Sequence, residues 1–176
     1  MRLIFPILVL LTLPGFTVVA HAADVAGRSP ELQVLDRFVG TWDFTVTAKP
    51  RDGQESTHKT SETRHWSLGG KFVLFENAQT ENPDEPHLHL LVTYDPSTKS
   101  YPAVMMIGAT RWLVDGTWDE QKSTMTFMGN SPVDGQTFVV QNRFVDKDHC
   151  ETTGMLKNAK GEVFLELTQK QTRRAQ

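Results

Sequence analysis

Alternating apolar and polar residues, interrupted at short intervals by turn-forming residues, fill the chain from residue 40 to its end. Trp42, Phe44 and Val46 alternate with polar neighbours, and residues 124–127 and 163–168 repeat the pattern. Such a period of two places successive side chains on opposite faces of a β-strand. Turn-forming groups occur at 50–53, 69–70, 82–86, 95–97, 119–120, 129–135, 146–148 and 158–161. The pattern therefore predicts about ten strands joined by short loops.

Short loops between consecutive strands favour antiparallel pairing, because parallel neighbours need a crossover of a dozen or more residues. An open meander of this length would leave two exposed edge strands, and closure removes both. We therefore predict an all-β fold, an antiparallel up-and-down β-barrel of about ten strands. Gly108-Ala109 is expected to be the corner that divides one long apolar run into two of these strands.

A short helix is predicted immediately before the first strand. Ser29 is a favourable N-cap and Pro30 suits the first helical position. Apolar residues then recur at helical spacing within 32–39, and Gly40 ends the pattern as a residue that tolerates a left-handed conformation. A helix this short is not stable alone, so its apolar face should plug one end of the barrel.

Composition narrows the function classes. The chain has 176 residues, enough for one domain, with 22% charged and 39% hydrophobic residues and a net charge of −3. This balance argues against a non-specific nucleic-acid binder and against a disordered chain. The single cysteine, Cys150, excludes an intrachain disulfide and a cysteine-rich zinc site, and we expect it to be a buried, inert thiol.

Residues 1–22 have the pattern of a secretory signal peptide. Arg2 precedes an apolar run over 3–13, Pro14 interrupts it, and Ala20-His21-Ala22 offers a small-residue cleavage site. The apolar run is too short for a comfortable membrane span, so no stable membrane anchor is expected after cleavage. We predict that residues 23–176 form a single barrel domain that is periplasmic or secreted.

Four segments resemble a known family. Leu35-Asp36-Arg37-Phe38-Val39-Gly40-Thr41-Trp42-Asp43 resembles the calycin barrels, which include lipocalins and fatty-acid-binding proteins, in placing a helix and then Gly-x-Trp at the start of the first strand. Together with segments 66–72, 92–96 and 115–119, it more closely resembles domain-of-unknown-function family 1579, a calycin-like group. The resemblance implies a barrel that could hold a small molecule, and it implies no reaction. One departure is the apolar stretch 105–110, where the family often has polar residues.

Signatures of catalysis are absent from the sequence. It contains no Gly-x-Ser-x-Gly elbow, no phosphate-binding loop, no His-Glu-x-x-His and no dinucleotide fingerprint. We therefore name no catalytic residue and expect no cofactor, while the sequence alone leaves enzymatic activity open.

Arg64 is a candidate ligand-binding residue. It shares a strand face with Glu62 and Trp66, so all three point inward if Trp66 does. A buried guanidinium offers two parallel donors to an acidic ligand. The alternatives are that Arg64 and Glu62 pair with each other or that Trp66 lies on the outer face.

Further candidates come from the aromatic and methionine-rich middle of the chain. Trp112 and Trp118 share one face, and Met106 lies in a group of methionines whose adaptable side chains suit an apolar pocket. A filled core would use the same residues. Strand count alone does not decide between a hollow and a filled barrel.

A structural arginine is also predicted. Gly40 and Trp42 form the Gly-x-Trp signature, and in calycins an arginine late in the barrel lies over this tryptophan. We assign that role to Arg143, which follows a run in which Phe138, Val140 and Phe144 share a face with Asn142.

His87 and His89 are weak candidates for a metal site. They lie two apart, so on a strand both side chains point to one face, and His65 or Glu76 could supply a third ligand. A haem ligand is a further alternative. The simpler interpretation is that both histidines face solvent at the start of a strand.

These observations lead to one hypothesis and two alternatives. We predict an exported barrel that binds a small apolar or amphipathic ligand, with no nucleic-acid partner. The alternatives are a metal- or haem-dependent protein that uses His87 or His89, and an interaction module whose filled barrel supports its loops.

Overall fold

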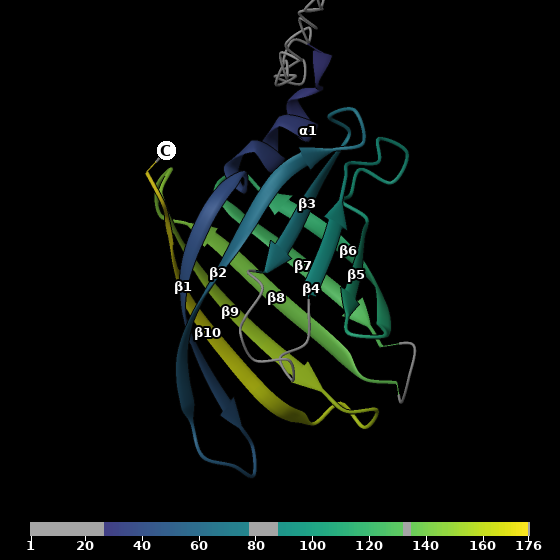
Figure 1. The fold of residues 1–176 in the computed structure, drawn as a ribbon. Coiled ribbons are helices and arrows are strands. Elements are labelled where there is room, and N and C mark those ends of the chain that lie inside the picture. The colour runs from purple at the N-terminus through teal and green to yellow at the C-terminus, as the bar shows by residue number, and fades with distance from the viewer. Residues whose placement is uncertain (1–26, 78–87, 132–134, 176) are drawn as a thin grey trace, which may run out of the picture.

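The computed structural model describes residues 27–77, 88–131 and 135–175 (Figure 1). The predicted signal peptide at 1–22 lies outside the described residues. Within the described part, no helix combines the length and apolar character needed to cross a membrane.

Ten strands follow one short helical segment in the described residues. The helical segment consists of α1 (Pro30–Gln33) and the 3-10 helix η2 (Val34–Arg37). The strands are β1 (Gly40–Pro50), β2 (Ser56–Ser67), β3 (Phe72–Asn77), β4 (Leu88–Val92), β5 (Ala103–Ile107), β6 (Thr110–Asp119), β7 (Thr124–Asn130), β8 (Thr137–Phe144), β9 (His149–Lys157) and β10 (Val163–Arg173).

The strands form a closed barrel in which each strand pairs antiparallel with its sequence neighbours. Closure comes from β1 and β10, which pair from Trp42 opposite Arg173 to Pro50 opposite Leu165. The predicted all-β up-and-down barrel is therefore confirmed. The expected corner is a tight turn between β5 and β6, where Gly108 has a φ of 56° that favours glycine.

The helical segment lies across one end of the barrel (Figure 1). It begins as predicted, because the Ser29 side chain accepts a hydrogen bond from the Leu32 amide and Pro30 occupies the first turn. Leu35 and Phe38 are fully buried beneath it, at 0% and 1% exposure. The Phe38 ring centroid lies 4.9 Å from that of Phe144 in an edge-on arrangement. The segment therefore closes this end of the barrel with apolar side chains.

Trp42 fastens the helical segment to the first strand. Its indole nitrogen donates a hydrogen bond of 2.7 Å to the Phe38 carbonyl, and its side chain is completely buried. The guanidinium carbon of Arg173 lies 4.5 Å from the centre of the Trp42 ring. Arg173 also donates hydrogen bonds to the Val39 and Arg37 carbonyls, so it ties the last strand to the helical segment.

The arginine over Trp42 is thus Arg173, and the assignment of this role to Arg143 is corrected. Arg143 lies on the outer face of β8 and forms an ion pair with Glu151. Side chains alternate along a strand, and the residues on either side of Arg143, Asn142 and Phe144, are both buried inside the barrel. The inward position of Phe144 therefore forces Arg143 outward.

Two inward-facing glycines shape the interior. A Cβ atom on Gly116 would lie 2.7 Å from the Phe127 ring, and one on Gly129 would lie 2.5 Å from the Phe138 ring. The two phenylalanine rings therefore occupy space beside the glycine backbone that a side chain would otherwise fill. This arrangement keeps them close to the barrel wall.

Replacing Gly129 by Ala should move the Phe138 ring inward. We expect a loss of about 1–3 kcal/mol in the free energy of unfolding, as for other overpacked interiors, measured by urea denaturation. The double variant G129A/F138L should recover part of this loss, because the smaller side chain vacates the contested space. A G129A protein as stable as the wild type would show that the ring is not confined there.

Candidate functional site

The barrel contains a cavity of about 450 Å³, within the usual range for small-molecule sites. It extends from below the helical segment toward the opposite end of the barrel. All ten strands contribute to its lining. The lining residues are Phe44, Val46, His58, Thr60, Ser61, Glu62, Arg64, Phe75, Asn77, Leu88, Leu90, Met105, Ile107, Trp112, Val114, Phe127, Phe138, Val140, Asn142, Thr152, Leu156, Leu167, Gln169 and Gln171.

Most of the cavity wall is apolar. Trp112 and Phe138 lie against each other with ring centroids 5.5 Å apart. Leu156 and Leu167, on β9 and β10, continue the apolar wall away from the helical segment. Such a wall favours the transfer of apolar groups from water by about 25 cal/mol per Å² of buried surface.

The end of the cavity nearer the helical segment is polar and contains a buried ion pair. Arg64 is 4% exposed, and its Nε donates a hydrogen bond of 2.5 Å to Glu62 Oε1. Its Nη2 donates a hydrogen bond of 3.0 Å to the side-chain oxygen of Gln171. Four aromatic rings surround the guanidinium, and the ring of Phe75 is the nearest, with its centre 4.8 Å from the guanidinium carbon.

From Gln171 a line of hydrogen bonds crosses three strands. Gln171 Nε2 donates to Thr152 Oγ1 at 2.6 Å, and Thr152 Oγ1 donates to Asn142 Oδ1 at 2.8 Å. Gln171 Nε2 also donates to Gln169 Oε1 at 3.1 Å. We refer to Glu62, Arg64, Asn142, Thr152, Gln169 and Gln171 as the polar floor. The charges of Arg64 and Glu62 cancel, so the polar floor carries no net charge.

Two of the five sequence-predicted ligand-binding residues line the cavity. They are Arg64 and Trp112, and Arg64 also forms the ion pair with Glu62 that was the alternative interpretation of this residue. Met106 is 42% exposed on the outer face, and its neighbour Met105 lines the cavity instead. In β5 the methionine that faces the cavity is therefore one position before the predicted one.

Trp66 and Trp118 lie beside the helical segment rather than in the cavity. The Trp66 indole nitrogen donates to Asp36 at 2.7 Å, and the guanidinium of Arg28 stacks 3.8 Å above its ring. The Trp118 indole nitrogen donates to Glu120 at 2.5 Å. These two tryptophans help to hold the helical segment in place, which is a structural role.

The polar floor contains residues that the sequence analysis did not select. Gln171, Thr152 and Gln169 lie on strands where inward and outward positions both carry polar side chains, so alternation in hydropathy gives no guide there. Asn142 was placed on the apolar face of its strand, and that position was a usable indication of an inward polar group.

His89 lies on the outer face and does not reach the cavity. Its Nδ1 is 3.6 Å from Glu76 Oε1, and His65 Nδ1 is 3.8 Å from the other oxygen of the same carboxylate. Across residues 27–77, 88–131 and 135–175, no group of three or more histidine, cysteine or acidic side chains is placed to hold a metal ion. His87 lies outside the described residues.

Cys150 is buried beside the polar floor at 1% exposure. Burial raises the pKa of its thiol to about 11, from 9.0. Because this pKa is raised in the folded state, stability is unaffected below pH 9 and falls as the pH rises from 9 to about 11.

We expect Cys150 to resist alkylation in the native protein. A pKa of about 11 in place of 9.0 leaves about a hundredfold less thiolate at pH 8, and burial also blocks the reagent. Mass spectrometry should show no iodoacetamide adduct on the native protein and complete labelling in guanidinium chloride. Rapid native labelling would contradict the buried position of the thiol.

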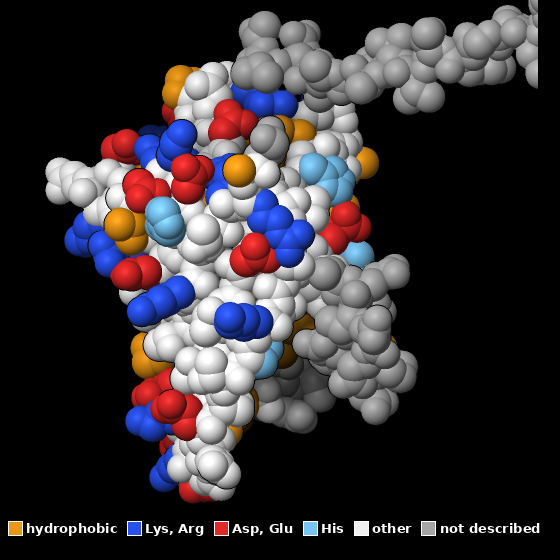
Figure 2. Space-filling view, turned by 60° about the vertical axis from the view of Figure 1, so that its left-hand side comes forward, with side chains coloured by type: hydrophobic (Ala, Val, Ile, Leu, Met, Phe, Trp, Pro, Cys, Tyr) orange, Lys and Arg blue, Asp and Glu red, His pale blue; other side chains and the backbone are white. Residues whose placement is uncertain are grey.

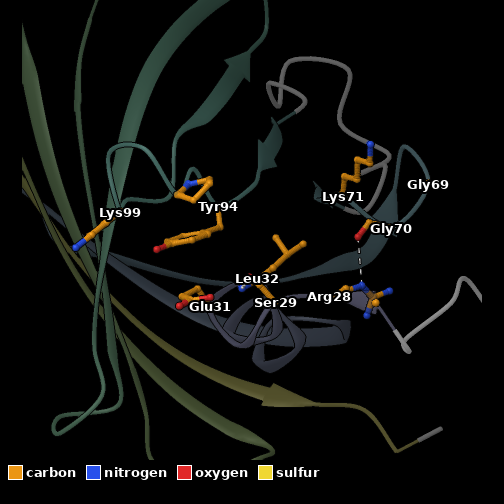
Figure 3. Close-up of a pocket in the computed structure, with 11 residues that line it drawn as sticks. Arg28, Ser29, Glu31, Leu32, Gly69, Gly70, Lys71, Tyr94 and Lys99 are labelled. Carbon is orange, nitrogen blue, oxygen red and sulfur yellow. Dashed lines mark hydrogen bonds between the residues drawn. The ribbon is translucent and has the colours of Figure 1, made fainter.

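A second hollow of about 680 Å³ lies on the outside, beside the helical segment (Figure 3). Figure 3 shows helix residues between the turn at Gly69 to Lys71 and the loop that carries Tyr94 and Lys99. Arg28, its most buried cation, already donates to the Gly70 carbonyl and pairs with Asp36. The hollow offers no buried polar group free for a ligand among its described residues, so the interior cavity is the stronger candidate.

The outer face formed by β1, β2 and β10 carries charges of both signs. Figure 2 shows Lys and Arg side chains beside Asp and Glu side chains on the face it presents, without a continuous basic patch. Arg174 pairs with Asp43 at 2.6 Å and Lys49 with Glu166 at 3.9 Å. Nothing on this face resembles the basic surface that phosphate contacts require.

The structure is a closed antiparallel barrel with a hollow interior. A helical segment covers one end and leads into the first strand, which begins with Gly-x-Trp. Together these features define a calycin-like barrel protein. The chain belongs to the family described as protein of unknown function (DUF1579), which matches residues 28–173. Among curated proteins, no sequence matches this chain.

Solved structures share the fold at low sequence identity. Rv2717c from M. tuberculosis has a TM-score of 0.63 and 11% identity, over 85% of this chain and 100% of that one. The S-type phycobiliprotein lyase CpeS from Guillardia theta has a TM-score of 0.58 and 12% identity, over 93% and 99%. A protein of unknown function from the DUF3598 family of Nostoc punctiforme has a TM-score of 0.55 and 11% identity, over 80% of this chain and 48% of that protein. At such identities the likeness establishes the fold alone.

Proposed function

We propose that this protein binds a small apolar or amphipathic molecule inside its barrel. The observation that carries the proposal is the cavity of about 450 Å³, apolar along most of its wall and polar at one end. A single long apolar space with a few convergent polar groups is the usual form of a small-molecule site. The interior is hollow, so the alternative of an interaction module built on a filled barrel loses its premise.

The ligand would enter with its polar end toward the helical segment. Thr152, Asn142 and Gln171 lie at that end, and Leu156 and Leu167 lie farther along the same strands. An amphipathic molecule can therefore place a polar head on the polar floor and an apolar tail along the wall. We further propose, from the pattern of residues 1–22, that binding takes place in the periplasm or outside the cell.

Titration with a neutral solvatochromic dye such as Nile red tests the proposal. The dye should gain fluorescence on binding the purified protein, and native mass spectrometry should detect any molecule retained from the host. The variant V140W fills the cavity and should abolish dye binding. V139W is its matched control, because Val139 lies on the outer face of the barrel, where its cross-strand neighbours are Met128 and Met155.

Three outcomes decide the matter. Binding by the wild type and V139W but not by V140W supports the proposal. Binding that survives in a folded V140W places the dye elsewhere and refutes it. The absence of binding by any small apolar molecule refutes it as well.

A further inference from the structure

The direction of the hydrogen bonds on the polar floor determines which groups a ligand meets there. A guanidinium can only donate, so the Gln171 atom that faces Arg64 must be the side-chain oxygen. Gln171 therefore presents its NH₂ group to Thr152 and Gln169, and accepting this bond turns the Thr152 proton toward Asn142. In each of these hydrogen bonds the residue nearer Arg64 is the donor and the next residue is the acceptor.

This line of bonds ends in donors that have no acceptor. Asn142 is 7% exposed and lines the cavity, and its oxygen is occupied by the Thr152 hydroxyl. Its Nδ2 has no hydrogen-bond acceptor among the described residues. The oxygen of Gln169 is likewise occupied by Gln171, which leaves the Gln169 amide nitrogen free at the cavity surface. Both amides therefore present a free donor to the cavity, and a ligand that accepts hydrogen bonds can satisfy them. Among the described residues, the buried side-chain nitrogen that lacks a partner is Nη1 of Arg64, at the same end of the cavity.

The charges around the cavity disfavour an anionic acceptor. The charge of Arg64 is neutralised by Glu62, whose side chain is only 14% exposed. The remaining titratable group in the lining is His58, six residues from Arg64 along β2 and therefore about 20 Å away. A carboxylate on the polar floor would lose its hydration and lie near the carboxylate of Glu62, and Arg64 could offer it only Nη1, the donor that Glu62 and Gln171 leave unused.

We propose that the cavity selects a neutral ligand with a carbonyl acceptor, such as an aliphatic ketone, ester or amide, over a fatty acid of the same length. The carbonyl oxygen accepts from Asn142 Nδ2 and Gln169 Nε2, and the alkyl chain lies along the apolar wall. This inference rests on the proposed function, since it names the ligand class of the same cavity.

Displacement of Nile red by three probes tests the proposal. The probes are 2-undecanone, methyl decanoate and sodium decanoate, titrated at pH 8, where the acid is ionised. We expect the ketone and the ester to bind at least about tenfold more tightly than decanoate. Equal or tighter binding of decanoate would overturn the inference and leave the proposed function standing. Failure of all three probes, and of the dye, would instead remove the proposed function.

Two variants separate the contributions of charge and of hydrogen bonding. In E62Q the amide oxygen still accepts from Arg64, but the negative charge is gone, so decanoate should bind at least about tenfold more tightly than to the wild type, with the ketone unchanged. In N142L the donor is lost, and ketone affinity should fall about tenfold while dye binding persists. Unchanged probe preference in both variants, each shown to be folded by circular dichroism, contradicts the assignment of the polar floor.

Discussion

The variant W42A should lose about 3–5 kcal/mol of its free energy of unfolding, the range for removing a large aromatic side chain from a core. Trp42 is completely buried, contacts Arg173 and Phe144, and donates to the Phe38 carbonyl. The substitution therefore leaves a cavity and also releases the end of the helical segment. Urea denaturation followed by circular dichroism measures the loss.

W42F is the matched control for this variant. It keeps an aromatic ring under the helical segment but lacks the indole N–H, so it should lose less than W42A and leave the Phe38 carbonyl without its donor. A second comparison is W118A, because Trp118 lies half-buried near the same end and bonds to exposed Glu120. If W42A were no more destabilising than W118A, Trp42 would not be the central contact of the closed end.

The barrel and its plug could be predicted because both depend on local patterns. The alternation of Trp42, Phe44 and Val46 and the short turns are sufficient for antiparallel closure. The capping by Ser29 is equally local. These features depend on spacing along the chain, which is visible without any knowledge of what packs against what.

The positions of individual side chains depended on strand phase and on distance along the barrel axis. Met106 was assigned to the interior although Met105 points inward, since a run of apolar residues does not fix the phase of alternation. Trp66 and Trp118 do lie near the core, but at the closed end, where they bond to Asp36 and Glu120. Sequence alternation says which face a residue occupies and not how far along the barrel it lies.

The hollow interior and the polar floor could not be predicted for a different reason. The volume of the cavity depends on how Phe127 and Phe138 pack against Gly116 and Gly129. These contacts join residues on neighbouring strands, and no pattern along the sequence indicates them. The hydrogen-bonded line from Arg64 to Asn142 joins residues on four strands that only the register brings together. The prediction of Arg143 as the arginine over Trp42 was wrong for the same reason. Only the pairing of β1 with β10, which closes the barrel, sets Trp42 opposite Arg173.

The variant R64L should also be destabilised, by up to about 3–5 kcal/mol, because it leaves a partly buried carboxylate without its partner. The Glu62 side chain is 14% exposed, and among the described residues its ion-pair partner is Arg64, while Arg173 is occupied at the helical segment. Gln171 Oε1 also loses its donor. Thermal unfolding or urea denaturation at pH 7 would measure the loss, with dye binding as a second readout.

The double variant R64L/E62L distinguishes a charge effect from a packing effect. Replacing a buried ion pair by apolar residues of similar size is often neutral, so the double variant should recover most of the loss and retain only the cost of the unpaired Gln171 oxygen. Its cavity should still bind Nile red, since the apolar wall is intact. If R64L and R64L/E62L were equally destabilised, the cost would come from the packing of Arg64 among its four aromatic neighbours rather than from an uncompensated charge. That result would separate the stability of the barrel from the charge balance on which its preference for a neutral ligand depends.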